Sequence, residues 1–306
     1  MDPSTTARAV LATLAGHDLH RAAAEHRMNP TDLATAVKLY QAGGLAALET
    51  RAATGGWHEF RIQFTHWETA EHLAITALAA QLGSIPGWWF IRKAPCWRLR
   101  FPASQPTGAI TSQLDMVQAS GGIACWWRCH YEPETLAFGG PEGVRVAHDL
   151  FHHDSNGILN YLGRPTPRIG RRELSILLCT ALFRGARQDW YEQGDIWNRV
   201  TALRPLAPPR TPPAATGVAT LMRSDTRNDG PLFAPHAPLD FAAPWIFAFH
   251  TAGSSLVHGA NNGTLRRGLR DVLAHHVIFH WNRLGLPAPA QRLLARAARD
   301  AVFNPG

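Results

Sequence analysis

The chain has 306 residues, 45% of them hydrophobic and 17% charged, a composition typical of a globular protein with one substantial core or two modest ones. Arginine supplies nearly all of the 30 basic residues against 23 acidic ones, and the formal charge of +7 favours an acidic partner. No apolar run reaches the roughly 18 residues that span a bilayer, and the N-terminus lacks a secretory signal. We therefore expect no membrane contact and a cytoplasmic location.

Residues 1–50 predict a small helical module. One helix is expected from Asp18 to His26, and the Asn29–Asp32 segment caps a second that continues through 33–42, because a cap residue followed by proline starts a helix. Two short helices with a tight connection resemble a helix-turn-helix. Such pairs more often pack on a neighbour, so direct DNA binding is not expected.

Strands and helices alternate over residues 57–131. Period-two alternation predicts strands at 57–64, 88–93, 97–101 and 123–131, with helices at 67–82 and 107–119. The strand at 57–64 is a candidate exposed edge, to which an extended peptide can add as a further strand.

Beyond residue 140 the pattern becomes helical. Helices are expected at 142–162, 171–191, 195–203, 264–284 and 287–302, and Gly194 is expected to end one helix before Asp195 opens the next. A Pro-rich loop is expected at 205–238. The fold class is therefore α+β, a mixed sheet with packed helices and a mainly helical C-terminal half, forming one domain over 55–306.

Two arginines in the strand at 97–101 indicate a ligand. Arg98 and Arg100 are two residues apart, so both guanidinium groups lie on one face of the sheet, while Trp97, Leu99 and Phe101 point to the other. Each guanidinium can bond both oxygens of a carboxylate. The pair therefore suits a carboxylate-bearing ligand.

Several short motifs follow one another along the chain in an order similar to that of one known family. They are Trp89–Arg92, Trp97–Phe101, Tyr131–Glu134, Phe138–Gly140, Phe151–Ser155 and Asn282–Leu284. In this order the chain resembles the C-terminal domain of lanthipeptide dehydratases, also called the thiopeptide-type bacteriocin biosynthesis domain, over roughly residues 55–302.

The resemblance implies a tailoring enzyme of ribosomally made peptides (RiPPs). In the large dehydratases, an N-terminal part attaches glutamate from glutamyl-tRNA to Ser or Thr of a precursor peptide, and the C-terminal part eliminates it to leave dehydroalanine or dehydrobutyrine. This chain resembles the stand-alone C-terminal type. Its implied partners are a precursor peptide, with leader and core, and a separate glutamyl-tRNA-dependent glutamylation enzyme. No cofactor is implied.

The resemblance also implies site residues. Arg98 and Arg100 match the family's catalytic arginine pair, and His280, two residues before Asn282, is the candidate for proton transfer. Polar groups expected to bind substrate are Arg145, Ser155, Tyr161, Glu132 and His276.

One departure leaves alternatives open. Ala137 stands where the family has an arginine, so that either Arg145 or Arg128 replaces it or the reaction differs. One alternative is a thiopeptide pyridine synthase, which joins two dehydroalanines in a formal [4+2] aza-cycloaddition and releases the leader peptide. Another is a non-catalytic subunit of a split dehydratase that binds the precursor peptide.

The sequence offers weak signals for a metal. His148 and His152, like His276 and His280, are four residues apart, which suits chelation from one helix face. Neither pair carries the glutamate of a His-Glu-x-x-His helix, and the cysteines lack a second pair at zinc spacing. We therefore expect no metal.

Overall fold

The computed structural model describes residues 3–54, 56–83, 85–204 and 215–304, and the chain divides into two compact units, 1–55 and 56–306. The first unit holds three helices: α1 (Pro3–Leu14), α2 (Leu19–Glu25) and α3 (Pro30–Thr54). The Asp18 carboxylate accepts a hydrogen bond from the Arg21 amide and so caps α2. Small side chains form the core of this unit: Ala9, Val10, Ala22, Ala23 and Leu33.

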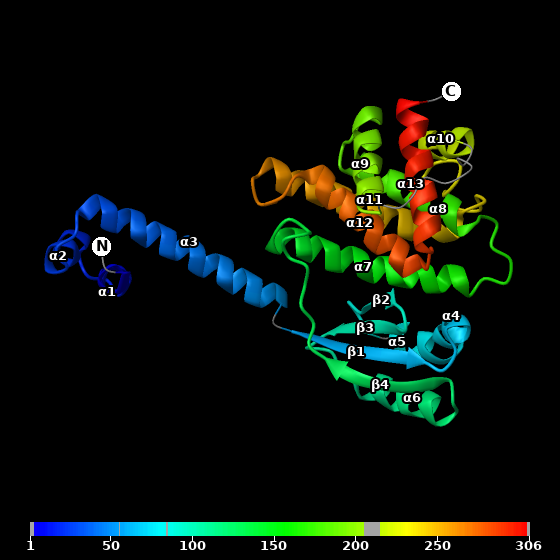
Figure 1. The fold of residues 1–306 in the computed structure, drawn as a ribbon, viewed down its shortest axis with the longest axis horizontal. Coiled ribbons are helices and arrows are strands. Elements are labelled where there is room, and N and C mark those ends of the chain that lie inside the picture. The colour runs from blue at the N-terminus through cyan, green and yellow to red at the C-terminus, as the bar shows by residue number, and fades with distance from the viewer. Residues whose placement is uncertain (1–2, 55, 84, 205–214, 305–306) are drawn as a thin grey trace. The chain divides into compact units, whose positions relative to one another are not determined.

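The second unit begins with a four-stranded antiparallel sheet (Figure 1). Its strands are β1 (Trp57–Phe64), β2 (Trp89–Lys93), β3 (Cys96–Pro102) and β4 (Ile123–Cys129). They lie in the order β2-β3-β1-β4. Each observed pairing is antiparallel, where the sequence predicted a mixed sheet. Because β1 lies between β3 and β4, the prediction of an exposed edge at 57–64 is wrong, and the edge strands are β2 and β4.

Helices cover one face of the sheet. A continuous helical stretch follows β1 and consists of η1 (Trp67–Thr69), α4 (Ala70–Leu73), a π-helical turn η2 (Ala74–Leu78) and α5 (Ala79–Gly83). Together with α6 (Gly108–Ala119), it buries the alternate strand side chains Phe60, Leu99 and Phe101. The opposite face of the strands therefore carries the intervening residues, which include Arg98 and Arg100.

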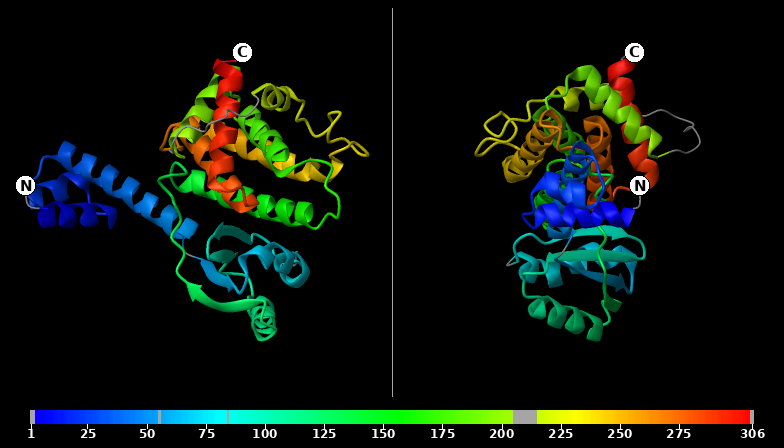
Figure 2. Two further views of the ribbon diagram at one scale, coloured as in Figure 1. Left: turned by 45° about the vertical axis from the view of Figure 1, so that its right-hand side comes forward. Right: turned by 90° about the vertical axis from the view of Figure 1, so that its left-hand side faces the viewer.

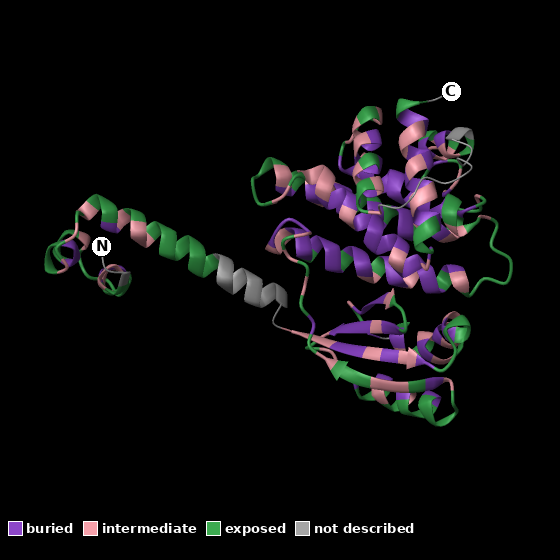
Figure 3. Cartoon of the chain, viewed as in Figure 1, coloured by how far each residue is buried: buried purple, intermediate pink, exposed green. Residues whose placement is uncertain are grey.

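The remaining helices form the larger layer. They are α7 (Pro141–Leu162), α8 (Arg171–Gly185), α9 (Trp190–Ala202), α10 (Ala215–Arg223), η3 (Asp240–Ala242), α11 (Ala243–Asn261), α12 (Leu269–Leu284) and α13 (Ala288–Phe303). Helix α7 lies between the sheet and the other helices of this layer (Figures 1 and 2), and β2 contacts both α7 and α12. Buried residues concentrate on α7, α8 and α12 (Figure 3). The fold is α+β, as the sequence predicted.

Helix α11 is absent from the sequence predictions. Its first half is apolar, while Gly253, Ser254, Ser255 and Gly259 in its second half have low helix propensity, so the sequence gives a weak helix signal. Glycines let it approach α8 closely, since a Cβ at Gly253 would collide with the carbonyl oxygen of Leu182, and one at Gly185 with that of His250.

Two other segments differ from the prediction. Helix α9 begins at Trp190, because Asp189 and Glu192 form a reciprocal capping box, and Gly194 lies inside the helix instead of ending one. The segment predicted as a loop at 205–238 includes helix α10, while residues 205–214 lie outside the described residues.

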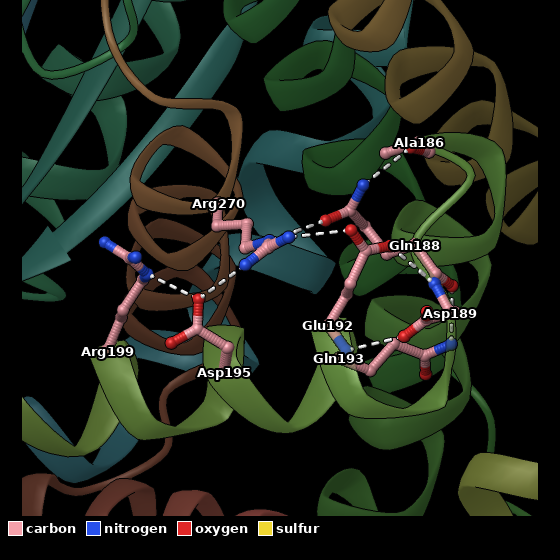
Figure 4. Close-up of polar contacts among 8 residues, drawn as sticks. All are labelled: Ala186, Gln188, Asp189, Glu192, Gln193, Asp195, Arg199 and Arg270. Atoms are coloured by element: carbon pink, nitrogen blue, oxygen red, sulfur yellow. Dashed lines mark hydrogen bonds and ion pairs between the residues drawn. The ribbon is translucent and has the colours of Figure 1, made fainter.

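An ion-pair network joins α9 to the start of α12 (Figure 4). The Arg270 guanidinium donates to Glu192 across 2.7 Å and to Asp195 across 3.2 Å. Arg199 donates to the same Asp195 and, across 2.5 Å, to Asp271. All of these groups are partly exposed, so the network contributes little to stability. Separately, none of the helices within the described ranges combines the length and apolar character that crossing a bilayer requires.

Candidate active site

Arg98 and Arg100 lie in the middle of the sheet, where β3 pairs with β1 on one side and β2 on the other. Opposite Arg100 are Glu59 of β1 and Trp89 of β2, and opposite Arg98 is Arg61 of β1. Directly paired residues share a face of the sheet. We call the face that carries Glu59, Arg61, Arg98 and Arg100 the arginine face.

Arg100 is held from three sides. Its Nε donates to Glu59 Oε2 across 2.7 Å, and its guanidinium carbon lies 4.3 Å from the ring of Trp89 and 4.1 Å from that of Tyr131. Burial lowers the pKa of Arg100, and the neighbouring charge of Arg98 adds to this effect. The guanidinium is thus fixed in position before any ligand arrives, which reduces the entropy lost on binding.

The arginine face carries more positive than negative charge. Glu59 accepts from Arg61 through Oε1 at 3.0 Å and from Arg100 through Oε2, so one carboxylate serves two guanidinium groups. Arg98 is half-buried, and within the described residues its Nε has no hydrogen-bond partner. Three guanidinium groups against one carboxylate leave capacity for an anionic ligand.

The segment after β4 crosses over this face. The Tyr131 hydroxyl lies 2.8 Å from His148 Nε2 on α7, and burial raises the pKa of Tyr131. Burial and the nearby Arg100 charge lower the pKa of His148 to about 3, so His148 is neutral at pH 7. Farther along the segment, Glu134 lies 3.0 Å from His275 Nε2 on α12.

Helix α12 presents two histidines to different surroundings. His280 Nδ1 lies 2.9 Å from Asp154 Oδ1 on α7, and its ring packs against Trp245 and Phe249 of α11. Its Nε2 is buried without a hydrogen-bond partner among the described residues. The Asp154 pairing orients the ring but places it deep among the helices.

His276 lies one helical turn earlier and faces a different group of residues. Its ring packs against Phe138 and Phe151, whose centroids are 4.9 and 6.1 Å away. Both ring nitrogens are buried without a partner in the described part of the chain. Burial, followed by the charges of His275 and Arg283, lowers the pKa of His276 to about 3, which leaves the imidazole neutral at pH 7.

Asp154 and Arg283 join the two helices beneath the site. Arg283 Nε donates to Asp154 Oδ2 across 2.8 Å, and Trp245 Nε1 donates to Oδ1 across 2.9 Å. Burial alone would raise the pKa of Asp154, but the His280 and Arg283 charges lower it, so the carboxylate stays ionised. Arg283 also lies close enough to Arg100 for each charge to affect the other. This cluster therefore connects α12 electrostatically to the arginine face.

Several residues predicted to bind substrate have other contacts. Ser155 is fully buried and accepts a hydrogen bond from the Phe90 amide, which ties β2 to α7. The Tyr161 hydroxyl donates to the carbonyl of Ile169 at the far end of α7. Arg145 pairs with Glu142 and Asp149 on the outer side of α7. Glu132 is exposed in the segment that follows β4.

The surroundings of Ala137 include an arginine that sequence reasoning did not consider. Arg267, in the loop before α12, donates to the carbonyl oxygen of Ala137 across 2.6 Å. Arg128, proposed as a replacement for the family arginine, lies 5.3 Å from the ring of Phe60 on the opposite face of the sheet. Arg145 lies on α7 with its own acidic partners, so Arg267 is the guanidinium that reaches residue 137.

The sequence did not single out Glu59 and Arg61, although the signal was present. Both occupy alternate positions of the strand at 57–64, and pairing β1 with β3 brings them beside Arg98 and Arg100. The pairing itself has no local sequence signal, because antiparallel partners are set by the whole sheet. Among the described residues, no three His, Cys, Asp or Glu side chains meet in a group able to hold a metal ion.

Comparison with known proteins finds a matching family and a similar solved structure. A family model described as "Lantibiotic biosynthesis dehydratase C-term" matches residues 57–302. The structure is similar to the crystal structure of the tRNA-dependent lantibiotic dehydratase MibB from Microbispora sp. 107891, with a TM-score of 0.55 and 16% sequence identity. That match covers 83% of this chain and 28% of the MibB chain, and at this identity it supports the fold alone. No curated protein matches the sequence.

Proposed function

Because the chain belongs to the family of lantibiotic biosynthesis dehydratase C-terminal domains, we propose that it eliminates glutamate from glutamylated Ser or Thr of a precursor peptide, leaving dehydroalanine or dehydrobutyrine. The family match supports a role in RiPP biosynthesis of the dehydratase type, with a peptide as partner. The reaction and the residues that perform it are proposed in addition to this role.

The observation that carries the proposal is the excess positive charge on the arginine face. Elimination releases glutamate as a carboxylate, and a departing anion needs a preorganised cation. Arg100 is fixed by Glu59, Trp89 and Tyr131, while Arg98 beside it retains an unpartnered Nε. Together they can bind the glutamyl carboxylates through charge-assisted hydrogen bonds.

We propose that His276, in place of the predicted His280, removes the α-proton. It lies on the side of α12 that faces Phe138 and Phe151, whereas His280 faces α11. His276 takes the proton, and the Cα–H electron pair becomes the second bond between Cα and Cβ. The Cβ–O bond breaks, and glutamate leaves with the electron pair of that Cβ–O bond.

The substrate must arrive already glutamylated. We propose that a separate glutamyl-tRNA-dependent enzyme supplies it, since the elimination chemistry described here uses only side chains that bind an anion and move a proton.

The direct test supplies a short synthetic peptide with one O-glutamylated serine. We expect release of free glutamate and a dehydroalanine that a thiol traps, with a fall of about a hundredfold or more in kcat/KM for Arg98→Ala. Arg128→Ala, on the opposite face of the sheet, is the matched control and should keep wild-type activity. Failure of the folded wild-type protein to release glutamate would overturn the proposal.

Ala137 favours a second candidate, a pyridine synthase. The side chain at 137 is a methyl group, and the nearby Arg267 uses one Nη to hold the residue's carbonyl. A cycloaddition of two dehydroalanines involves no carboxylate to bind, so it tolerates the missing arginine. A peptide with two preinstalled dehydroalanines distinguishes the reactions. Ring formation with leader release supports the synthase, and an unchanged peptide argues against it.

A further inference from the structure

A cavity of about 710 Å³ lies at one end of the arginine face. Trp57 at the start of β1, Gly87 before β2 and Pro102 at the end of β3 form its sheet side. The opposite walls come from α7, around His148, and from α11, around Phe247. A cavity of this size accommodates a large side chain together with part of its backbone.

The wall contributed by the sheet and α11 is apolar. Trp57, Pro102 and Phe247 all line the cavity, and the Phe247 side chain is 57% exposed. An exposed aromatic ring inside a concave site gains free energy when a ligand covers it. This wall therefore favours a flat, apolar group.

The α7 wall carries hydrogen-bonding groups that add no net charge. Burial lowers the pKa of His148 to about 3, and burial also lowers that of His153, so both imidazoles are neutral at pH 7. His152 donates from Nδ1 to the Trp88 carbonyl across 2.8 Å, and its Nε2 lies 3.3 Å from the Asn156 side-chain amide. The positive charge of Arg145 is compensated by Asp149 at 3.1 Å. The two charged groups that line the cavity, Arg145 and Asp149, are therefore paired with each other.

The strand register connects this cavity to the arginines. Successive pairs on the same face of β1 and β3 are Trp57 with Pro102, Glu59 with Arg100, and Arg61 with Arg98. Each step is two residues, or about 7 Å along a strand, so the cavity lies about 7 Å from the level of Arg100 and about 13 Å from that of Arg98. An extended peptide covers these spans in two and four residues.

Aromatic rings lie between the cavity and Arg100. Tyr131 contacts Trp57 with ring centroids 6.0 Å apart and hydrogen-bonds His148, while its other side covers Arg100. Tyr131 therefore contacts Arg100 and two residues that line the cavity, Trp57 and His148. A peptide bound along the arginine face would reach the cavity at the spacing that the strand register sets.

We propose that this cavity is a specificity subsite for the precursor peptide, and that it takes an aromatic side chain two to four residues from the glutamylated serine or threonine. The inference rests on the proposed elimination reaction. It names the class of peptide that the enzyme selects, which neither the family nor the arginine pair specifies.

The test compares synthetic O-glutamylseryl peptides that carry Phe, Ala or Asp at positions two, three and four on either side of the modified serine. We expect at least one Phe peptide to show a KM lower by about tenfold or more than its Ala and Asp counterparts. In the Phe247→Ala variant this preference should disappear, while kinetics with the Ala peptide stay unchanged. Tyr191→Ala, which removes an exposed aromatic ring from α9, should preserve the preference.

A second measurement separates the two proposals. The same peptides with unmodified serine, labelled with a fluorophore, report binding by anisotropy whether or not the protein eliminates glutamate. Tighter binding of a Phe peptide that depends on Phe247 supports the subsite even where no turnover occurs. Equal binding of Phe, Ala and Asp peptides overturns the subsite and leaves the elimination reaction to be judged by glutamate release.

Discussion

Arg283 Nε and Asp154 Oδ2 lie 2.8 Å apart, and neither side chain is more than 1% exposed. The pair joins α12 to α7, and His280 and Trp245 complete the donors around the carboxylate. Because these charges are shielded from water, each depends on the other for compensation.

Asp154→Asn should therefore destabilise the protein strongly. The substitution removes the negative charge and leaves the Arg283 guanidinium buried without compensation, which costs about 3–5 kcal/mol. Urea unfolding followed by tryptophan fluorescence measures the change. Asp149→Asn, on the same helix but exposed, is the control and should cost less than about 1 kcal/mol. Similar losses for both variants would contradict the role assigned to the buried pair.

The pH dependence of stability should reflect His148 and His276. The pKa of each is lowered to about 3 in the folded chain from 6.5, mainly by burial. Between these values the unfolded chain binds protons that the folded chain excludes. The contribution of the two histidines to stability is therefore complete above about pH 6.5. Below that pH the unfolding free energy falls as pH decreases, by about 1.4 kcal/mol per pH unit for each histidine.

A substitution isolates this effect from that of the carboxylates. His276→Gln should reduce the slope of unfolding free energy against pH, measured between about pH 4 and 6, by about one proton. His20→Gln, at an exposed position of α2, should leave the slope unchanged. An unaltered slope in His276→Gln would show that this imidazole is already accessible to protons in the folded state.

The two histidines of α12 should differ in activity. His276→Asn removes the proposed base and should lower kcat by about a hundredfold or more, with little change in KM for the glutamylated peptide. His280→Asn retains a group able to donate to Asp154, so its main effect should be on stability. Glutamate release and thermal unfolding, measured on both variants, distinguish these outcomes. The reverse ranking of kcat would assign proton transfer to His280.

Tyr131→Phe should separate the effect of the ring from the effect of the hydroxyl. The ring keeps its place over Arg100, while the hydrogen bond to His148 is lost, which costs about 1–2 kcal/mol of stability. Since Arg100 stays in position, KM for the glutamylated peptide should change by less than about threefold. Tyr131→Ala removes the ring as well and should raise KM further. Equal effects of Phe and Ala would assign the function to the hydroxyl.

Local patterns in the sequence predicted much of the sheet and the side of it that holds the arginines. Alternation correctly placed Arg98 and Arg100 on the face of the sheet that Leu99 does not occupy, because successive side chains of a strand point to opposite faces. The same alternation contained Glu59, but its contact with Arg100 depends on strand pairing over a separation of 41 residues. Such contacts have no local signal.

The motifs proved less informative about the site than about the scaffold. Ser155, expected to bind substrate, holds the Phe90 amide, and Arg92 of the same strand pairs with Glu71. Asn282 accepts from Gln291 of α13. Polar residues in motifs satisfy buried partners as often as they contact ligands, and only three-dimensional contacts distinguish the two. Helix α11 was missed because the Gly and Ser residues of its second half have low helix propensity.

The hydrogen bond between Ser155 and the Phe90 amide has a consequence for gene mining. It links two of the motifs by which this family is recognised, and it serves the assembly of the scaffold whichever reaction follows. Genome searches built on those two segments therefore select chains by this architectural contact, whatever product each chain makes.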